Sequence, residues 1–104
     1  MTVIIEWVKP YRNKKLLEAV RQMPCQHCGA QDGTVCAAHS NLAEHGKGMG
    51  QKASDAMIAA LCHRCHSRLD HGKDLNKADR KEMWLDAYVN TMRWLIENEK
   101  LILA

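Results

Sequence analysis

Two pairs of cysteines constrain the fold of this chain more than any other feature. Cys25 and Cys28 form one Cys-x-x-Cys turn, and Cys62 and Cys65 form a second. Such a turn lets two thiolates reach one tetrahedral zinc ion at about 2.3 Å, and two turns complete a closed site. Structural zinc contributes on the order of 10 kcal/mol to the folding of small domains. We therefore predict a structural Zn²⁺ site built from these four cysteines.

A redox role is the main alternative for a Cys-x-x-Cys pair. Thioredoxin-like chemistry uses one pair in a βαβ setting, whereas this chain has two pairs without that setting. The fifth cysteine, Cys36, lies in a short apolar run, which favours a buried thiol over a ligand or nucleophile. An odd number of cysteines without a signal peptide favours a reducing cytoplasm, where disulfides are rare.

Length and charge set wide limits on function. The 104 residues suit a single domain over 1–104 with a modest core, since the chain has six Met and three Trp but no Phe. A net charge of +3 permits nucleic-acid binding without requiring it. No apolar run approaches the roughly 20 residues that span a bilayer, so we expect no membrane association.

Propensity and capping residues predict an α+β fold. β-branched and aromatic residues favour a strand over 2–8, and Asn13 is a suitable cap for a helix over 14–22. A short strand is expected over 34–39, and the residues over 63–70 have helical potential. Asn76 and Asp79 begin a long amphipathic helix over 77–97, whose apolar stripe predicts a core or an oligomer face.

Histidines flank the cysteine pairs in a suggestive order. His39 ends the apolar run after the first pair, His66 follows the last cysteine, and Asp70 lies one helical turn further on. Imidazole and carboxylate ligands suit a catalytic Mg²⁺ or Mn²⁺ with open coordination positions. A neutral His39 could then take a proton from an attacking water.

With these residues in view, the chain resembles the HNH endonucleases. The shared order is Cys-x-x-Cys, then Ala38-His39, then Cys62-x-x-Cys65-His66. The layout of segments 46–52 and 62–70, with Asp55 between them, is similar to a narrower group. That group holds short prophage-encoded nucleases of YbcO type and the RecA-dependent phage nuclease Ref. The resemblance covers roughly residues 24–72.

The resemblance implies a zinc-stapled ββα-metal (His-Me finger) core that hydrolyses DNA. It makes His39 the general base, and it makes His66 and Asp70 the ligands of the catalytic Mg²⁺ or Mn²⁺. It also implies a phage or prophage setting in a bacterial host cell, with DNA and a recombinase filament as expected partners. The flanking strand and helices belong to no motif that we can name.

Two positions depart from the family pattern. Many HNH proteins carry an acidic residue or a second histidine where this chain has Ala38, and the middle Asn of the motif aligns near Met57. Asp55 stands nearby, where it either substitutes for that Asn or caps the loop. The glycine-rich segment 46–52 either brings Lys47 and Lys52 to substrate phosphates or is only a flexible loop.

Other interpretations of these residues stay open at the level of sequence. His66 is either a cation ligand or a partner of the zinc cysteines, Asp70 is either a ligand or a solvated helix residue, and His71 could replace it. His39 could be a strand-end core histidine. The whole chain could be a non-catalytic zinc module that binds DNA or protein, or an assembly protein that dimerises. The dimer would form through the apolar face around Trp84, Tyr88 and Trp94.

Overall fold

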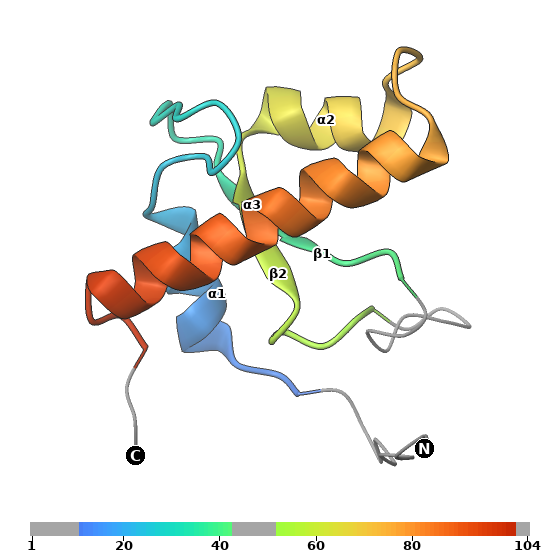
Figure 1. Cartoon of the computed structure of the whole chain (residues 1–104). Helices are drawn as coiled ribbons and strands as arrows, with labels where there is room; N and C mark the ends of the chain where they lie inside the picture. The colour runs from blue at the N-terminus through green and yellow to red at the C-terminus, as the bar shows by residue number, and fades with distance from the viewer. Residues whose placement is uncertain (1–10, 43–51, 102–104) are drawn as a thin grey trace, which may run out of the picture.

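The computed structural model describes residues 11–42 and 52–101, which form a small α+β arrangement (Figure 1). Three helices accompany one two-stranded antiparallel sheet among these residues. In chain order the elements are α1 (Lys14–Arg21), β1 (Cys36–His39), β2 (Ile58–Leu61), α2 (His63–His71) and α3 (Lys77–Glu97). The strand predicted over 2–8 and the loop residue Lys47 lie outside the described residues.

The two strands pair in a register that places His39 opposite Ile58 and Cys36 opposite Leu61. β1 begins two residues later than predicted, because Thr34 belongs to a turn. Its backbone N–H and its hydroxyl both bond to the Asp32 carboxylate, at 3.0 and 2.6 Å. The Thr34 hydroxyl also accepts from the N–H of His63, so this residue ties the turn to the start of α2.

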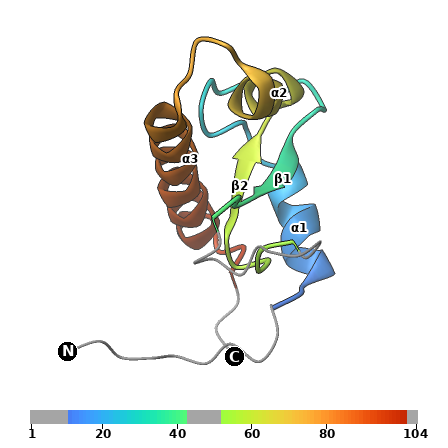
Figure 2. The ribbon, with the colours of Figure 1, turned by 90° about the vertical axis from the view of Figure 1, so that its right-hand side faces the viewer.

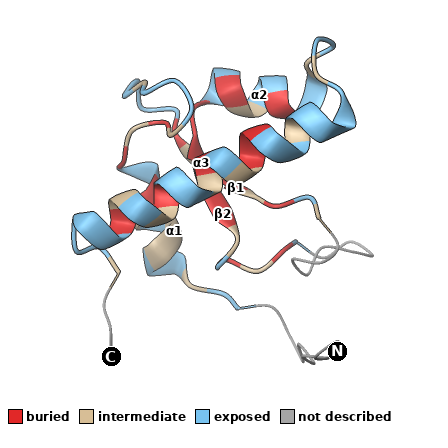
Figure 3. Ribbon diagram, in the orientation of Figure 1, coloured by how far each residue is buried: buried red, intermediate tan, exposed pale blue. Residues whose placement is uncertain are grey.

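Helices cover the sheet from two sides, with α3 on one face and α1 on the other (Figure 2). Val20 of α1 and Leu95 of α3 are fully buried, as are all four residues of β2. Figure 3 shows the buried residues gathered where the helices meet the strands. The core therefore lies between the helices and the two strands.

Capping residues set the helix starts as the sequence predicts. The Asn13 side chain accepts from the N–H of Leu16 at 3.1 Å at the start of α1. Asn76 and Asp79 form a reciprocal capping box, and α3 runs over the predicted residues. The helix predicted over 63–70 ends one residue later, where the Arg80 guanidinium donates to the carbonyls of Leu69 and Gly72.

Two side chains of α3 bond to the backbone of the sheet. The Trp84 indole N–H donates to the Ala38 carbonyl at 3.0 Å. The Thr91 hydroxyl accepts from the Ala60 N–H at 2.9 Å and donates to the Ala87 carbonyl at 2.7 Å. Trp84 is only 5% exposed, so it belongs to the core and not to an open dimer face. In the described ranges, no helix combines the length and the apolar character that a membrane crossing requires.

Candidate functional site

Backbone hydrogen bonds fold both cysteine turns toward each other. The Cys25 N–H donates to the Ala30 carbonyl at 3.0 Å, and the Gly29 N–H donates to the Cys25 carbonyl at 2.9 Å. Gly29 has φ +80°, a left-handed conformation that glycine adopts without strain. The N–H of Gln26 donates to the Ala60 carbonyl at 2.8 Å, which fastens the first turn to the edge of β2.

The second cysteine turn is the start of α2. Cys62 is the N-cap of that helix and Cys65 lies in its first turn. Because both residues sit at a strand-to-helix junction, their side chains project toward the first turn. The predicted zinc site therefore combines residues from two segments that lie far apart in the sequence.

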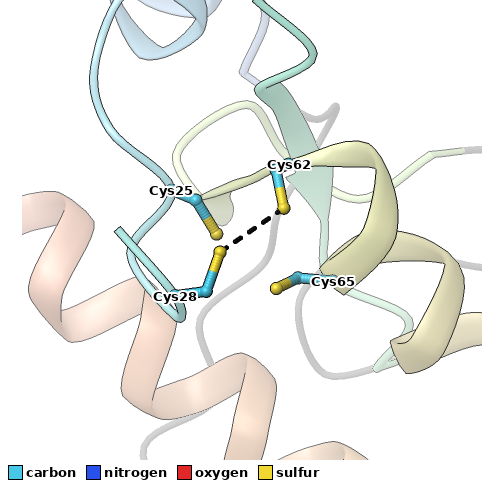
Figure 4. Close-up of side chains that lie close together, drawn as sticks. All are labelled: Cys25, Cys28, Cys62 and Cys65. Carbon is cyan, nitrogen blue, oxygen red and sulfur yellow. Dashed lines mark hydrogen bonds between the residues drawn. The ribbon is translucent and has the colours of Figure 1, made fainter. Parts of the chain in front are cut away.

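The four thiols meet as predicted and could hold a zinc ion (Figure 4). Their Sγ atoms all lie within 4.8 Å of one another, and those of Cys28 and Cys62 are 3.6 Å apart. Tetrahedral zinc with bonds of about 2.3 Å places its sulfurs about 3.8 Å apart. The donor set and its spacing therefore fit Zn²⁺. Cys28 is exposed and the other three are buried.

Burial makes it hard for all four thiols to ionise together without a cation. For Cys25, burial is outweighed by the N–H groups of Cys28, Cys62 and His27, which lower its pKa to about 7. Burial and the neighbouring thiols raise the pKa of Cys65 well above its usual value. Burial also raises the pKa of Cys62. A bound divalent cation removes this conflict by compensating the negative charges.

Cys36 stands apart from the four-thiol cluster. Its Sγ lies 3.4 Å from the Leu61 carbonyl oxygen and 3.2 Å from His66 Nδ1. Burial raises the pKa of the Cys36 thiol, which favours the neutral form. This half-buried thiol thus occupies one ring nitrogen of His66 and leaves Nε2 as the nitrogen that faces Asp70.

His39, at the end of β1, bonds to a buried carboxylate. Its Nε2 lies 2.7 Å from Asp55 Oδ1, and the two side chains are 16% and 4% exposed. Among the described residues, His39 Nδ1 makes no hydrogen bond. In the tautomer whose Nε2–H donates to the carboxylate, Nδ1 carries the lone pair that a general base uses.

Asp55 is held in place from three sides. Its Oδ2 accepts from the Asn13 N–H at 2.7 Å, and its Oδ1 lies 3.3 Å from the Arg12 guanidinium. Burial raises the pKa of Asp55, but the His39 hydrogen bond, the Asn13 N–H and the charge of Arg12 outweigh it. The pKa of Asp55 is therefore lower than usual. Asp55 stays ionised and does more than cap a loop.

His66 and Asp70 share one face of α2, as their spacing predicts. His66 Nε2 lies 3.3 Å from Asp70 Oδ2, and both side chains are about one-third exposed (37% and 34%). His71 is exposed and does not join them, so it does not take the place of Asp70 beside His66. The pair offers an imidazole nitrogen and a carboxylate oxygen on an open surface.

One cavity brings these groups together. A hollow of about 230 Å³ is lined by His39 from the sheet, by His66 and Asp70 from α2, and by Lys52 and Asn41 from the connecting segments. His27 and His63, the two histidines inside the cysteine turns, are exposed and do not line it. The cavity thus contains a candidate base, two candidate cation ligands and one cation, all close to the four-thiol site.

Two contributors were missed at the level of sequence. Arg12 and Asn13 hold Asp55, and the Arg12 guanidinium also donates to the carbonyls of Ala53 and Lys52. Asn13 was assigned only as a helix cap. No local pattern in the sequence points to these contacts, because the partners are about forty positions apart.

No family model, curated protein or solved structure matches this chain.

Proposed function

We propose that this protein is a metal-dependent endonuclease that hydrolyses DNA phosphodiester bonds. The observation that supports the proposal is the shared cavity, in which His39 faces the same space as His66, Asp70 and Lys52. A base, a cation site and a positive charge are the groups that phosphodiester hydrolysis uses. The order of elements around them, two antiparallel strands followed by α2, also agrees with the expected ββα arrangement.

In this proposal His39 removes a proton from the attacking water. Asp55 holds Nε2–H, so Nδ1 accepts the proton and the imidazolium that forms is stabilised by the adjacent carboxylate. Asp55 thus has the positioning role that the HNH pattern gives to an Asn. A buried carboxylate fixed by Arg12 and Asn13 keeps the ring in one orientation through the reaction.

His66 and Asp70 are the proposed ligands for a catalytic Mg²⁺ or Mn²⁺. The Cys36 thiol engages His66 Nδ1, which directs Nε2 to the side where Asp70 lies. A bound divalent cation would supply stabilisation of the phosphate charge and of the leaving oxygen. Ala38 is 1% exposed and offers no third ligand, so substrate oxygens and water would complete the coordination.

Lys52 adds a positive charge at the edge of the same cavity and is the proposed phosphate contact. Lys47, the second lysine assigned to this role, lies outside the described residues. A bacterial host, a phage or prophage origin and a recombinase filament as partner stay part of the proposal, and these three rest on the family resemblance alone. The cytoplasmic setting, also part of the proposal, is the one that the odd number of cysteines favours.

Cleavage assays with His39 variants test the proposal. Zinc-loaded wild type, His39→Ala and His39→Gln are incubated with Mg²⁺ or Mn²⁺. The substrates are supercoiled plasmid, single-stranded DNA and recombinase-coated single-stranded DNA. Loss of a general base lowers the rate by roughly a hundredfold or more, and His39→Gln keeps a donor for Asp55 without the base. The exposed His71→Ala is the matched control and should cleave like wild type.

A second candidate is a non-catalytic zinc module that binds DNA or protein. The observation that favours it is that only two side chains, His66 and Asp70, are placed to bind the catalytic cation. The position that supplies a further ligand in many HNH proteins is the apolar and buried Ala38. It predicts DNA binding without cleavage and without any effect of His39→Ala. Equal cleavage by wild type and both His39 variants would point to another base or to a contaminating enzyme.

A further inference from the structure

Helix α3 carries apolar residues on two sides. One side packs on the sheet, and its buried residues are Met83, Trp84, Ala87, Thr91 and Leu95. A second apolar row repeats at intervals of four, three and four positions, which places it along one face of the helix. We call this row the outer stripe, and its members are Leu85, Val89, Met92 and Ile96. At about 100° per residue, the outer stripe lies roughly 140° around the helix from the side that packs on the sheet.

The outer stripe is open to solvent in the part of the chain that the structure describes. Val89 and Ile96 are each 62% exposed, and the third exposed large apolar residue of the described ranges is Tyr11. Leu85 and Met92 are partly buried. Figure 2 shows α3 as the outer layer on one side of the sheet, with no other described element beyond it. Apolar side chains that line up along one face, rather than being scattered singly, mark an interaction surface.

The residue types of the outer stripe fit a second copy of the same helix. Alternating intervals of four and three are the repeat by which two helices pack along each other, and β-branched Val89 and Ile96 alternate with the unbranched Met92 and with Leu85. Two copies of this row can interdigitate, because side chains of each enter the spaces of the other. Such a contact uses the same surface on both partners, as two-fold dimers do.

Charged residues beside the outer stripe favour an antiparallel pair. Asp86 and Arg93 each follow a stripe residue by one position, so both lie along the same edge of the stripe. An antiparallel pair brings Asp86 of one copy to Arg93 of the other, and the two-fold axis repeats this contact. A parallel pair would separate the two residues by about two helical turns.

Both charges are accessible for such a contact. Asp86 is exposed. Arg93 pairs with Glu97 one turn further along at 2.6 Å, and its side chain is 75% exposed. A guanidinium has five N–H donors in a planar fork, so Arg93 can bond Glu97 and a second carboxylate together.

We propose that the outer stripe is a self-association surface, on which α3 of a second copy packs antiparallel with Asp86 of each copy beside Arg93 of the other. This face differs from the one around Trp84, Tyr88 and Trp94, since Trp84 is buried against the sheet. None of the four stripe residues lines the His39 cavity, so the inference does not depend on the proposed function.

The dimer should be weak. The outer stripe is about 17 Å long at 1.5 Å per residue. We expect a contact of this length to bury less than the roughly 1,200 Å² that is typical of stable complexes. A dissociation constant on the order of 100 µM is therefore expected, which makes dimers a minor species in dilute protein.

Sedimentation equilibrium of zinc-loaded protein in reducing buffer tests the surface, from about 10 µM to about 1 mM. Val89→Glu puts a charge into the outer stripe. Asn90→Glu is the matched control, because it adds the same charge at the next exposed position, off the stripe. Val89→Glu should weaken association at least about tenfold, since its charge would be desolvated in the contact. Asn90→Glu should stay within about twofold of wild type.

Charge reversal tests the antiparallel arrangement. Asp86→Arg and Arg93→Asp should each weaken association roughly fivefold at low salt, because like charges then meet at two symmetric positions. The double variant Asp86→Arg/Arg93→Asp has the same net charge as wild type and brings opposite charges together again. Its association should recover to within about twofold of wild type.

Urea unfolding and zinc content, measured in dilute protein, show whether each variant is folded. A wild type that stays monomeric at the highest concentration, or equal association by Val89→Glu, would overturn the proposal. So would a double variant that does not recover. A monomeric wild type with a less stable Val89→Glu variant would assign the outer stripe to another segment of the same chain, such as the apolar segment 2–8, and would also overturn it.

Discussion

Asp55 is the residue on which the polar contacts around His39 converge. It joins the end of β1 to the segment before α1, through His39 on one side and Arg12 and Asn13 on the other. Asp55 itself is 3% exposed, so its carboxylate is shielded from bulk water although the Arg12 side chain is not. A carboxylate so enclosed has both a structural and an electrostatic effect.

Replacing Asp55 by Asn should destabilise the protein. The amide keeps the size of the side chain but loses charge-assisted bonds, which contribute roughly 1.5–3 kcal/mol each, so a loss of about 2 kcal/mol is expected at pH 7. Urea unfolding followed by tryptophan fluorescence measures it at a fixed zinc concentration. Asp74→Asn, which removes an exposed carboxylate, is the control and should have little effect.

The effect of Asp55→Asn should also depend on pH. Because the folded-state pKa of Asp55 is lower than the unfolded one, its stabilisation is complete above the unfolded value of about 4. It is lost as pH falls through the folded value. The difference between wild type and variant should therefore shrink as the pH falls below the unfolded value of about 4. A difference that stays unchanged in strong acid would contradict this assignment.

At the scale of elements, the cysteine turns connect units that are too short to be stable alone. Each strand has four residues and α2 has nine. Isolated helices of that length are marginal in water, and so are isolated two-stranded pairs. A zinc ion held between the turn at 25–28 and the start of α2 would fix the ends of β2 and α2 together.

Loss of one zinc ligand should therefore unfold the centre of the protein. Cys65→Ser should lower zinc content well below one equivalent and remove much of the free energy of unfolding, which metal raises by up to the order of 10 kcal/mol. Cys36→Ser is the matched control, because Cys36 lies outside the four-thiol cluster. Zinc content by atomic emission and secondary structure by circular dichroism provide the comparison. Equal zinc loss in both variants would show that the ligand set is wrong.

At the scale of the whole molecule, α3 joins the sheet to the rest of the fold. On the outer edge of β2, the backbone groups of Ala60 find hydrogen-bond partners without a third strand. The Thr91 hydroxyl accepts a hydrogen bond from the Ala60 N–H, and the Gln26 N–H donates to the Ala60 carbonyl. Covering an edge in this way prevents pairing with another chain at that position.

Thr91→Val should test that docking. The change is nearly isosteric, but it leaves the buried Ala60 N–H without its partner, at an expected cost of about 1–3 kcal/mol. Thr91→Ser keeps the hydroxyl and loses one methyl group, which costs about 1 kcal/mol. Urea unfolding of zinc-saturated protein compares the two. If the Val variant is as stable as wild type, the Thr91 bond does not hold α3 on the sheet.

The sequence by itself determined the features that depend on neighbouring residues. The cap at Asn13, the capping box at Asn76 and the bounds of α3 follow from contacts within one helical turn. The four-cysteine cluster follows from the short reach of two Cys-x-x-Cys turns, and the pairing of His66 with Asp70 follows from helical spacing.

Only the tertiary structure decided which distant side chains meet. The Asp55 bond to His39, the support from Arg12 and the Cys36 contact with His66 all join residues from separate segments. Trp84 could be placed in the core and not on an open face only once α3 was docked on the sheet. The reason is physical: local patterns specify the shape of an element, whereas the packing of elements around a shared core selects the contacts between them.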